Sequence, residues 1–314
     1  MHEIFISFAL IVCAGILFRR LRVGGLDADS MRLSINALVF NLFLPALCIK
    51  SVYISGIDIN TILVPVTAGL TIIFTMFISL AAYHVLGRVT NMTKPEKGCL
   101  VISATFGNVV YLGLPVITGL YGEGASKYAL FYDLLAGTPL LWVLGASVAS
   151  KYGGGGRMAI SDSLKTITSL PPIWGLIAGM VLKAAGIGLP EFVVNALDML
   201  GGLVIPLMVF SIGLALSLPK VKHASLIVPA VIIKLAVAPF IAYTIADLLG
   251  VKGNALASCC IEGAMPTMVL TLLIASRFGL DTSLAGFMIV VTTVLSFFTL
   301  PITLKTIGLL NRLY

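Results

Sequence analysis

The chain has 314 residues, of which 59% are hydrophobic and only 11% are charged, and its mean hydropathy is +1.10. Soluble domains carry roughly 25% charged residues, so this composition excludes an ordinary soluble protein and predicts an integral membrane protein whose first partner is the lipid bilayer. The net charge of +7 comes from basic residues scattered over short loops, so it does not indicate a nucleic-acid partner.

Most of the sequence falls in ten apolar segments, each expected to form a helix that crosses the membrane. Their approximate bounds are 3–18, 31–53, 61–86, 98–121, 126–149, 168–186, 190–218, 225–250, 254–276 and 283–310. Apolar sequence begins directly after Glu3, without a basic region or a cleavage site, so the first segment is expected to be a retained span and not a signal peptide. The predicted fold is therefore all-α and polytopic, with ten transmembrane helices.

A glycine-rich stretch divides these segments five and five. Four consecutive glycines lie at 153–156, within a linker expected to span 151–167. The predicted domains are a first five-helix repeat at 1–150 and a second at 168–314. Thirteen of the 20 basic residues fall in loops on the linker's side of the membrane. The positive-inside rule thus predicts a cytoplasmic linker and both termini outside the plasma membrane, here a bacterial inner membrane.

Prolines recur at similar places in the two halves. Pro45, Pro115 and Pro139 are followed 161, 151 and 162 residues later by Pro206, Pro266 and Pro301. An odd number of spans turns a second copy upside down in the membrane, so this spacing favours an inverted repeat of five plus five helices.

Two apolar segments contain residues that disfavour a continuous helix. The fourth carries Gly107-Asn108 and Gly113-Leu114-Pro115, and the ninth carries Glu262-Gly263-Ala264-Met265-Pro266. We expect these helices to break at Pro115 and Pro266, because a proline removes a backbone donor and clashes with the preceding turn. Broken helices offer amides that suit an anionic carboxylate and carbonyls that suit a cation, which is typical of a transporter.

These motifs, together with Asn36-Ala37-Leu38-Val39-Phe40-Asn41-Leu42-Phe43-Leu44-Pro45-Ala46-Leu47, resemble the auxin efflux carrier family. That family includes plant auxin exporters and bacterial permeases for malonate and other organic acids, and the short linker is similar to the bacterial members. The resemblance implies scaffold and transport domains, each formed from both inverted repeats, with crossing fourth and ninth helices. It also implies a homodimer and a fold shared with bile-acid sodium symporters.

Glu262 is the first candidate ion-coupling residue. A carboxylate inside a membrane segment is costly unless it is protonated, paired or metal-bound. In the sodium symporters of the shared fold a glutamate in the equivalent segment binds sodium, which implies a sodium site at Glu262 and Asn108. Structural pairing of Glu262 with Lys234 is the alternative. No cofactor beyond a sodium ion or a proton is expected.

Two further polar residues join this ion-coupling set, each with an alternative. Asn108 either contacts the substrate or the ion through its amide, or caps the broken helix. Asp133, in the fifth segment, either completes the cation site or carries a proton, or else lies near the membrane surface.

The candidate substrate contacts lie at the two interruptions and in the second segment; they are Asn41, Asn108, Tyr111, Pro115, Pro266 and Thr267. For Asn41 the alternative is a hydrogen bond between helices. Lys50 and Asp198, near segment ends, are expected to reach water.

We therefore predict a secondary active transporter that moves a small organic anion, a carboxylate such as malonate or an auxin-like acid, by alternating access. The alternative is a sodium- or proton-coupled symporter of a bile-acid-like or other organic solute. A channel is disfavoured by the interrupted helices. An intramembrane enzyme is disfavoured because the metalloprotease, serine-hydrolase and Walker motifs are absent from the sequence, so we predict no catalytic residue.

Overall fold

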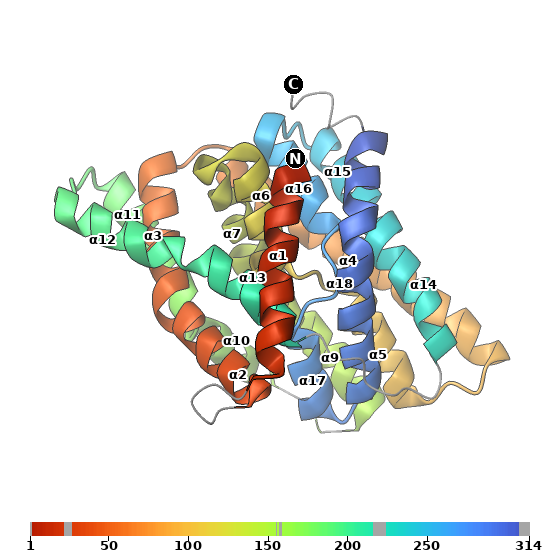
Figure 1. Cartoon of the computed structure of the whole chain (residues 1–314). Helices are drawn as coiled ribbons and strands as arrows, with labels where there is room; N and C mark the ends of the chain where they lie inside the picture. Colours follow the sequence, from red (N-terminus) through yellow and green to blue (C-terminus); the bar gives the residue numbers. More distant parts are fainter. Residues whose placement is uncertain (1, 22–26, 155, 157–158, 216–223, 308–314) are drawn as a thin grey trace. The chain divides into compact units, whose positions relative to one another are not determined.

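The computed structural model in Figure 1 describes residues 2–21, 27–154, 156, 159–215 and 224–307. In these residues all regular secondary structure is helical, apart from one isolated antiparallel bridge between Gly107 and Thr267. The all-α prediction is confirmed. Several residues used for the linker and for the orientation lie outside the described ranges: Arg22, Gly155, Arg157, Lys220, Lys222 and Arg312.

The described residues contain six helical stretches that are long and apolar enough to cross a membrane. They are Ala28–Ser55, Asn60–Val89, Glu123–Gly153, Glu191–Ala215, Ala224–Leu248 and Thr282–Thr306. A pair of helices bent by 64°, Ser161–Thr168 and Pro171–Ala184, makes a seventh if it is counted as one span. The remaining predicted segments hold shorter or divided helices, so the count of ten spans stays a prediction.

The chain forms two compact units, and each draws on both sides of the glycine-rich linker. Unit 1 comprises Met1–Thr61, Val110–Leu130 and Ile167–Ser217. Its helices are α1 (His2–Arg19), α2 (Ala28–Leu38), α3 (Leu44–Ser55), α6 (Leu114–Tyr121), α11 (Pro171–Ala184), α12 (Glu191–Gly202) and α13 (Val204–Ala215). Within it α3 packs against α11 and α12, and α1 lies alongside α13 (Figure 1).

Small residues let the helices of unit 1 approach closely. Where α1 meets α13, a Cβ atom added to Gly213 would lie 2.2 Å from the carbonyl oxygen of Val12 and 2.8 Å from the Cα of Gly15. Likewise, a Cβ on Gly175 of α11 would lie 2.6 Å from the carbonyl oxygen of Pro45 in α3. Inside a membrane, where burial of apolar surface drives helix association only weakly, such close backbone contact is a main source of packing energy.

Unit 2 comprises Ile62–Val109, Phe131–Thr166 and Leu218–Tyr314. Its longer helices are α4 (Asn60–Val89), α5 (Lys94–Thr105), α9 (Ala146–Gly153), α10 (Ile160–Thr168), α15 (Ala238–Leu248), α16 (Gly253–Gly263), α17 (Leu270–Phe278) and α18 (Thr282–Thr306), with α14 (Ile227–Ile232) and α8 (Thr138–Leu140) as short pieces. The helix α7 (Ser126–Tyr132) has residues in both units. Unit 2 contains both helix interruptions that the sequence indicates.

Four of the five π-helical segments in the described residues end two positions before a proline. They are Val39–Phe43 before Pro45, Val109–Gly113 before Pro115, Asp133–Gly137 before Pro139 and Ile233–Val237 before Pro239. A proline has no amide hydrogen to donate to the carbonyl four residues earlier, so the helix can widen by one residue there. The amide before the proline then bonds five residues back, as Thr138 does to the carbonyl of Asp133.

This widening explains where the fourth helix actually breaks. The sequence predicts a break at Pro115, which is wrong: α5 ends at Thr105, the helix resumes at Val109, and Pro115 lies within the first turn of α6. The break is therefore at residues 106–108. In the ninth segment the prediction is confirmed, because Pro266 lies between the end of α16 and the start of α17.

The close crossing of α1 and α13 can be tested with a single methyl group. Gly213→Ala should lower the melting temperature of the detergent-solubilised protein, because overpacking against a backbone carbonyl costs about 1–3 kcal/mol. The matched control is Gly202→Ala, where no heavy atom from outside the local helix lies within 4 Å of the new Cβ. That variant should match or exceed the wild type, and equal melting temperatures for the two variants would contradict the close packing.

Candidate binding site at the helix breaks

The two breaks in unit 2 pair with each other through their backbones. The amide of Asn108 donates to the carbonyl of Pro266 at 2.7 Å, and the amide of Met268 donates to the carbonyl of Phe106 at 2.9 Å. These bonds flank the antiparallel bridge between Gly107 and Thr267. Because a bilayer offers no water to unpaired backbone groups, each break satisfies polar groups that the other exposes.

Thr267 connects these two paired breaks, called the crossing from here on, to two neighbouring helices by hydrogen bonds. Its amide donates to Oγ1 of Thr292 in α18 at 3.0 Å, and its own Oγ1 donates to the carbonyl of Ser103 in α5 at 2.8 Å. The Ser103 carbonyl is one of the last in α5 and has no amide of its own helix to accept from. Thr267 thus has a structural task, and its contact with substrate stays a prediction.

Buried oxygen atoms without hydrogen-bond partners gather beside the crossing. Glu262 is 1% exposed and neither of its carboxylate oxygens has a partner among the described residues. The same holds for Oδ1 of Asn108 and Oδ1 of Asp133, whose Oδ2 accepts from Thr138 at 3.0 Å. The charge of Asp133 acts on Glu262. Buried acceptors of this kind are costly unless a cation or protons reach them.

These positions bear on two pairs of interpretations that the sequence leaves open. A capping role for Asn108 would need its Oδ1 to accept an amide of the following helix, and that oxygen accepts none in the described part of the chain. The Asn108 oxygen therefore does not cap the helix that follows the break, and its contact with substrate or ion stays a prediction. Asp133 is buried within unit 2, 2% exposed, and its charge acts on Glu262, while its part in a cation site also stays a prediction.

Lys234 belongs to the same buried polar cluster as Glu262, Asp133 and Asn108. The sequence suggested it only as a counter-charge. It lies in the π segment before Pro239, is 2% exposed, and donates from Nζ to the carbonyl of Gly263 at 2.9 Å. Its charge also acts on Glu262, yet the carboxylate accepts no hydrogen bond from it. A Cβ on Gly107 would lie 3.2 Å from Nζ, so the glycine at the break leaves room for the ammonium.

The other three predicted substrate contacts, Asn41, Tyr111 and Pro115, lie in unit 1. The Asn41 side chain is exposed, and its Nδ2 donates to the carbonyl of Ala37 in its own helix at 2.7 Å, so the proposed bond between helices is not made by this amide. Tyr111 is half-buried in a π segment and Pro115 is buried in α6. Their contact with substrate remains a prediction.

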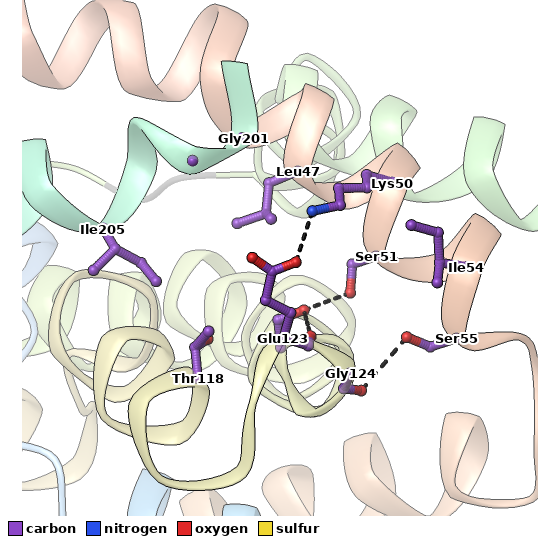
Figure 2. Close-up of a pocket in the computed structure, with 12 residues that line it drawn as sticks. Leu47, Lys50, Ser51, Ile54, Ser55, Thr118, Glu123, Gly124, Gly201 and Ile205 are labelled. Carbon is purple, nitrogen blue, oxygen red and sulfur yellow. Dashed lines mark hydrogen bonds and ion pairs between the residues drawn. The ribbon is translucent and has the colours of Figure 1, made fainter. Parts of the chain in front are cut away.

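Unit 1 contains a cleft that the sequence did not indicate (Figure 2). Lys50, expected to reach water, instead pairs there with Glu123 at 2.7 Å and also with Asp198. The lysine side chain is 12% exposed, against 75% and 57% for the two acids. The sequence offered one signal for the pairing of Lys50 with Glu123. The expected topology places Lys50 and the loop that contains Glu123 on the same side of the membrane.

Next to this cleft, Lys127 binds the loop after α3. Its Nζ donates to Oδ2 of Asp58 at 3.1 Å and lies within hydrogen-bond distance of two backbone carbonyls. Burial alone would raise the pKa of the Asp58 carboxyl, but the hydrogen bond and charge of Lys127 outweigh it and lower that pKa below its ordinary value. In unit 1, Lys50 and Lys127 thus each pair directly with a carboxylate, whereas the Glu262 carboxylate of unit 2 accepts no hydrogen bond within the described residues.

Comparison with known proteins defines the class. A family model described as membrane transport protein matches residues 4–169 and 156–304. The chain is 32% identical over 227 residues to an uncharacterized transporter of Methanocaldococcus jannaschii, covering 70% of this chain and 72% of the relative. It is 28% identical over 308 residues to an uncharacterized transporter of Methanothermobacter thermautotrophicus, covering 96% of each.

The chain is therefore a multi-pass membrane transporter and not an enzyme. It belongs to the membrane transport protein family, of the auxin efflux carrier type, which confirms the resemblance seen in the sequence.

The hydroxyl of Thr267 offers a test of the crossing itself. Thr267→Val keeps the side-chain shape but leaves the Ser103 carbonyl without its donor, so we expect a loss of about 1–3 kcal/mol in the free energy of unfolding, seen as a lower melting temperature. Thr306→Val is the matched control, since Thr306 is exposed and donates only within α18. If both variants melt at the same temperature, the Thr267 hydroxyl does not support the crossing.

Proposed function

We propose that the chain is a secondary transporter that carries a small organic anion, a carboxylate such as malonate or an auxin-like acid, by alternating access. The single observation that supports it is the buried polar cluster at two paired helix breaks. The amide group of Asn108 is a donor for a carboxylate, and α17, which begins at Leu270, gives the break a partial positive charge. Family membership supports transport as such.

Ion coupling in this proposal resides in Glu262, Asp133 and Asn108. Their partnerless oxygens favour the uptake of a cation or a proton over a site that handles an anion alone. For the same reason a cation-coupled symporter of a larger organic solute is the second candidate. A transport screen of organic acids of different sizes would distinguish the carrier of a small carboxylate from the symporter of a larger solute.

The finer architecture is part of the same proposal. Ten spans would form two inverted repeats, with both termini outside the plasma membrane and two copies of the chain in a dimer. Unit 2, which holds both breaks, would be the transport domain, and unit 1 the scaffold. Interruptions in the fourth and ninth predicted segments, at corresponding places of the two halves, support this arrangement.

Transport by proteoliposomes tests the role of Glu262. We expect Glu262→Gln to reduce the stimulation of malonate uptake by a sodium or proton gradient by about tenfold or more, because the amide cannot neutralise a cation. Uptake of radiolabelled malonate under imposed gradients measures this.

The matched control is Glu191→Gln, an exposed acid in the first turn of α12, which should keep the wild-type ion dependence. Transport by Glu262→Gln that equals the wild type at every sodium concentration and pH would remove Glu262 from the mechanism.

A further inference from the structure

Lys234 holds the place at the ninth-helix break that a bound cation would take. The carbonyl of Gly263 ends α16, where the helix dipole is negative, and Nζ of Lys234 lies 2.9 Å from it. Glu262, one residue earlier, has its charge close enough to act on the same ammonium. A helix-end carbonyl and a carboxylate are the ligands that a hard cation selects.

A sodium ion does not fit beside this lysine. Coordinated by Glu262, it would share a buried site with the Lys234 ammonium, and like charges repel strongly where water is excluded. At the Gly263 carbonyl it would compete with Nζ, which already donates a hydrogen bond to that oxygen. The described residues contain no cluster of three or more acidic, histidine or cysteine side chains able to hold a metal ion.

The cluster already contains a buried positive charge. The Lys234 ammonium acts on the charge of Glu262, which in turn acts on that of Asp133. The remaining titratable groups around Glu262 are Tyr132, Cys259 and Cys260, which are ordinarily neutral at neutral pH. The Lys234 ammonium thus supplies, from the chain itself, the positive charge that a bound ion would bring to Glu262.

We infer that Lys234 is a built-in cation that replaces sodium at the helix break, so that this chain binds no sodium there and acquires a sodium site when the ammonium is removed. The inference rests on the ion coupling proposed at Glu262 and narrows it, because it removes sodium from the two ions considered there. Glycine at position 107 is part of the arrangement, because a Cβ there would lie 3.2 Å from both Cε and Nζ of the lysine.

The test measures melting temperature in detergent, without substrate, in sodium chloride and in choline chloride of equal ionic strength. Wild-type protein should melt at the same temperature in both salts. Lys234→Met keeps an unbranched apolar chain of similar length. It should melt about 2–5 °C higher in sodium chloride than in choline chloride, because an ion that binds only the folded state stabilises that state. Sodium stabilisation of the wild type, or its absence in Lys234→Met, would overturn the inference.

Three variants separate this role from a merely structural one. Lys234→Arg keeps a cation and should remain insensitive to sodium. Lys234→Met combined with Glu262→Gln should lose the gained response, since the carboxylate ligand is gone. Lys183→Met, at an exposed lysine of α11, should respond as the wild type does. A sodium response in the arginine variant would assign the effect to altered packing.

If Lys234→Met does not fold, the wild type and Lys234→Arg still test the first part of the inference, because a sodium response in either would contradict it. The assay contains no organic anion, so its outcome is independent of malonate uptake. Failure of uptake would refute the proposed substrate and leave the built-in cation standing.

Discussion

The backbone pairing between the two breaks is the constraint on which unit 2 depends. Two amide–carbonyl bonds, from Asn108 to Pro266 and from Met268 to Phe106, pair backbone groups of one break with those of the other where α5 and α16 end inside an apolar protein. Close approach is needed as well: a Cβ on Gly263 would lie 2.8 Å from the Cβ of Ala242 in α15. Because the two helix ends are fixed by these bonds, the side chains beside them are fixed too.

Sequence alone indicated the class of protein and two of the polar residues at the candidate site, for a physical reason. Polar residues are rare in apolar segments, so Asn108 and Glu262 were conspicuous, and both lie at the paired breaks. The position of the first break was missed because a proline can be absorbed by a widened helical turn, as Pro115 is. The contacts of Lys234 and Lys50 were missed because they depend on which helices are neighbours, and periodicity does not encode that.

Each unit contains a lysine whose charge acts on acids, but the surroundings differ. Lys50 of unit 1 pairs with Glu123 and Asp198, whereas Lys234 of unit 2 acts on Glu262. The acids around Lys50 are more than half exposed, and exposed ion pairs contribute roughly 0–1 kcal/mol, so that group can rearrange at little cost. The acids near Lys234 are buried, where breaking a charge partnership costs about 3–5 kcal/mol. Burial therefore separates an adaptable cluster from a fixed one.

The π segments before the prolines also bear on how related chains should be aligned. A π turn holds one residue more than the α turn it replaces, and one residue corresponds to about 100° of rotation around a helix. A relative that lacks one residue and the proline at such a place would keep both flanking helices in register with their neighbours. One-residue gaps at Asp133–Gly137 and Ile233–Val237 are thus compatible with an unchanged core, whereas gaps elsewhere in these helices would turn one whole face away from it.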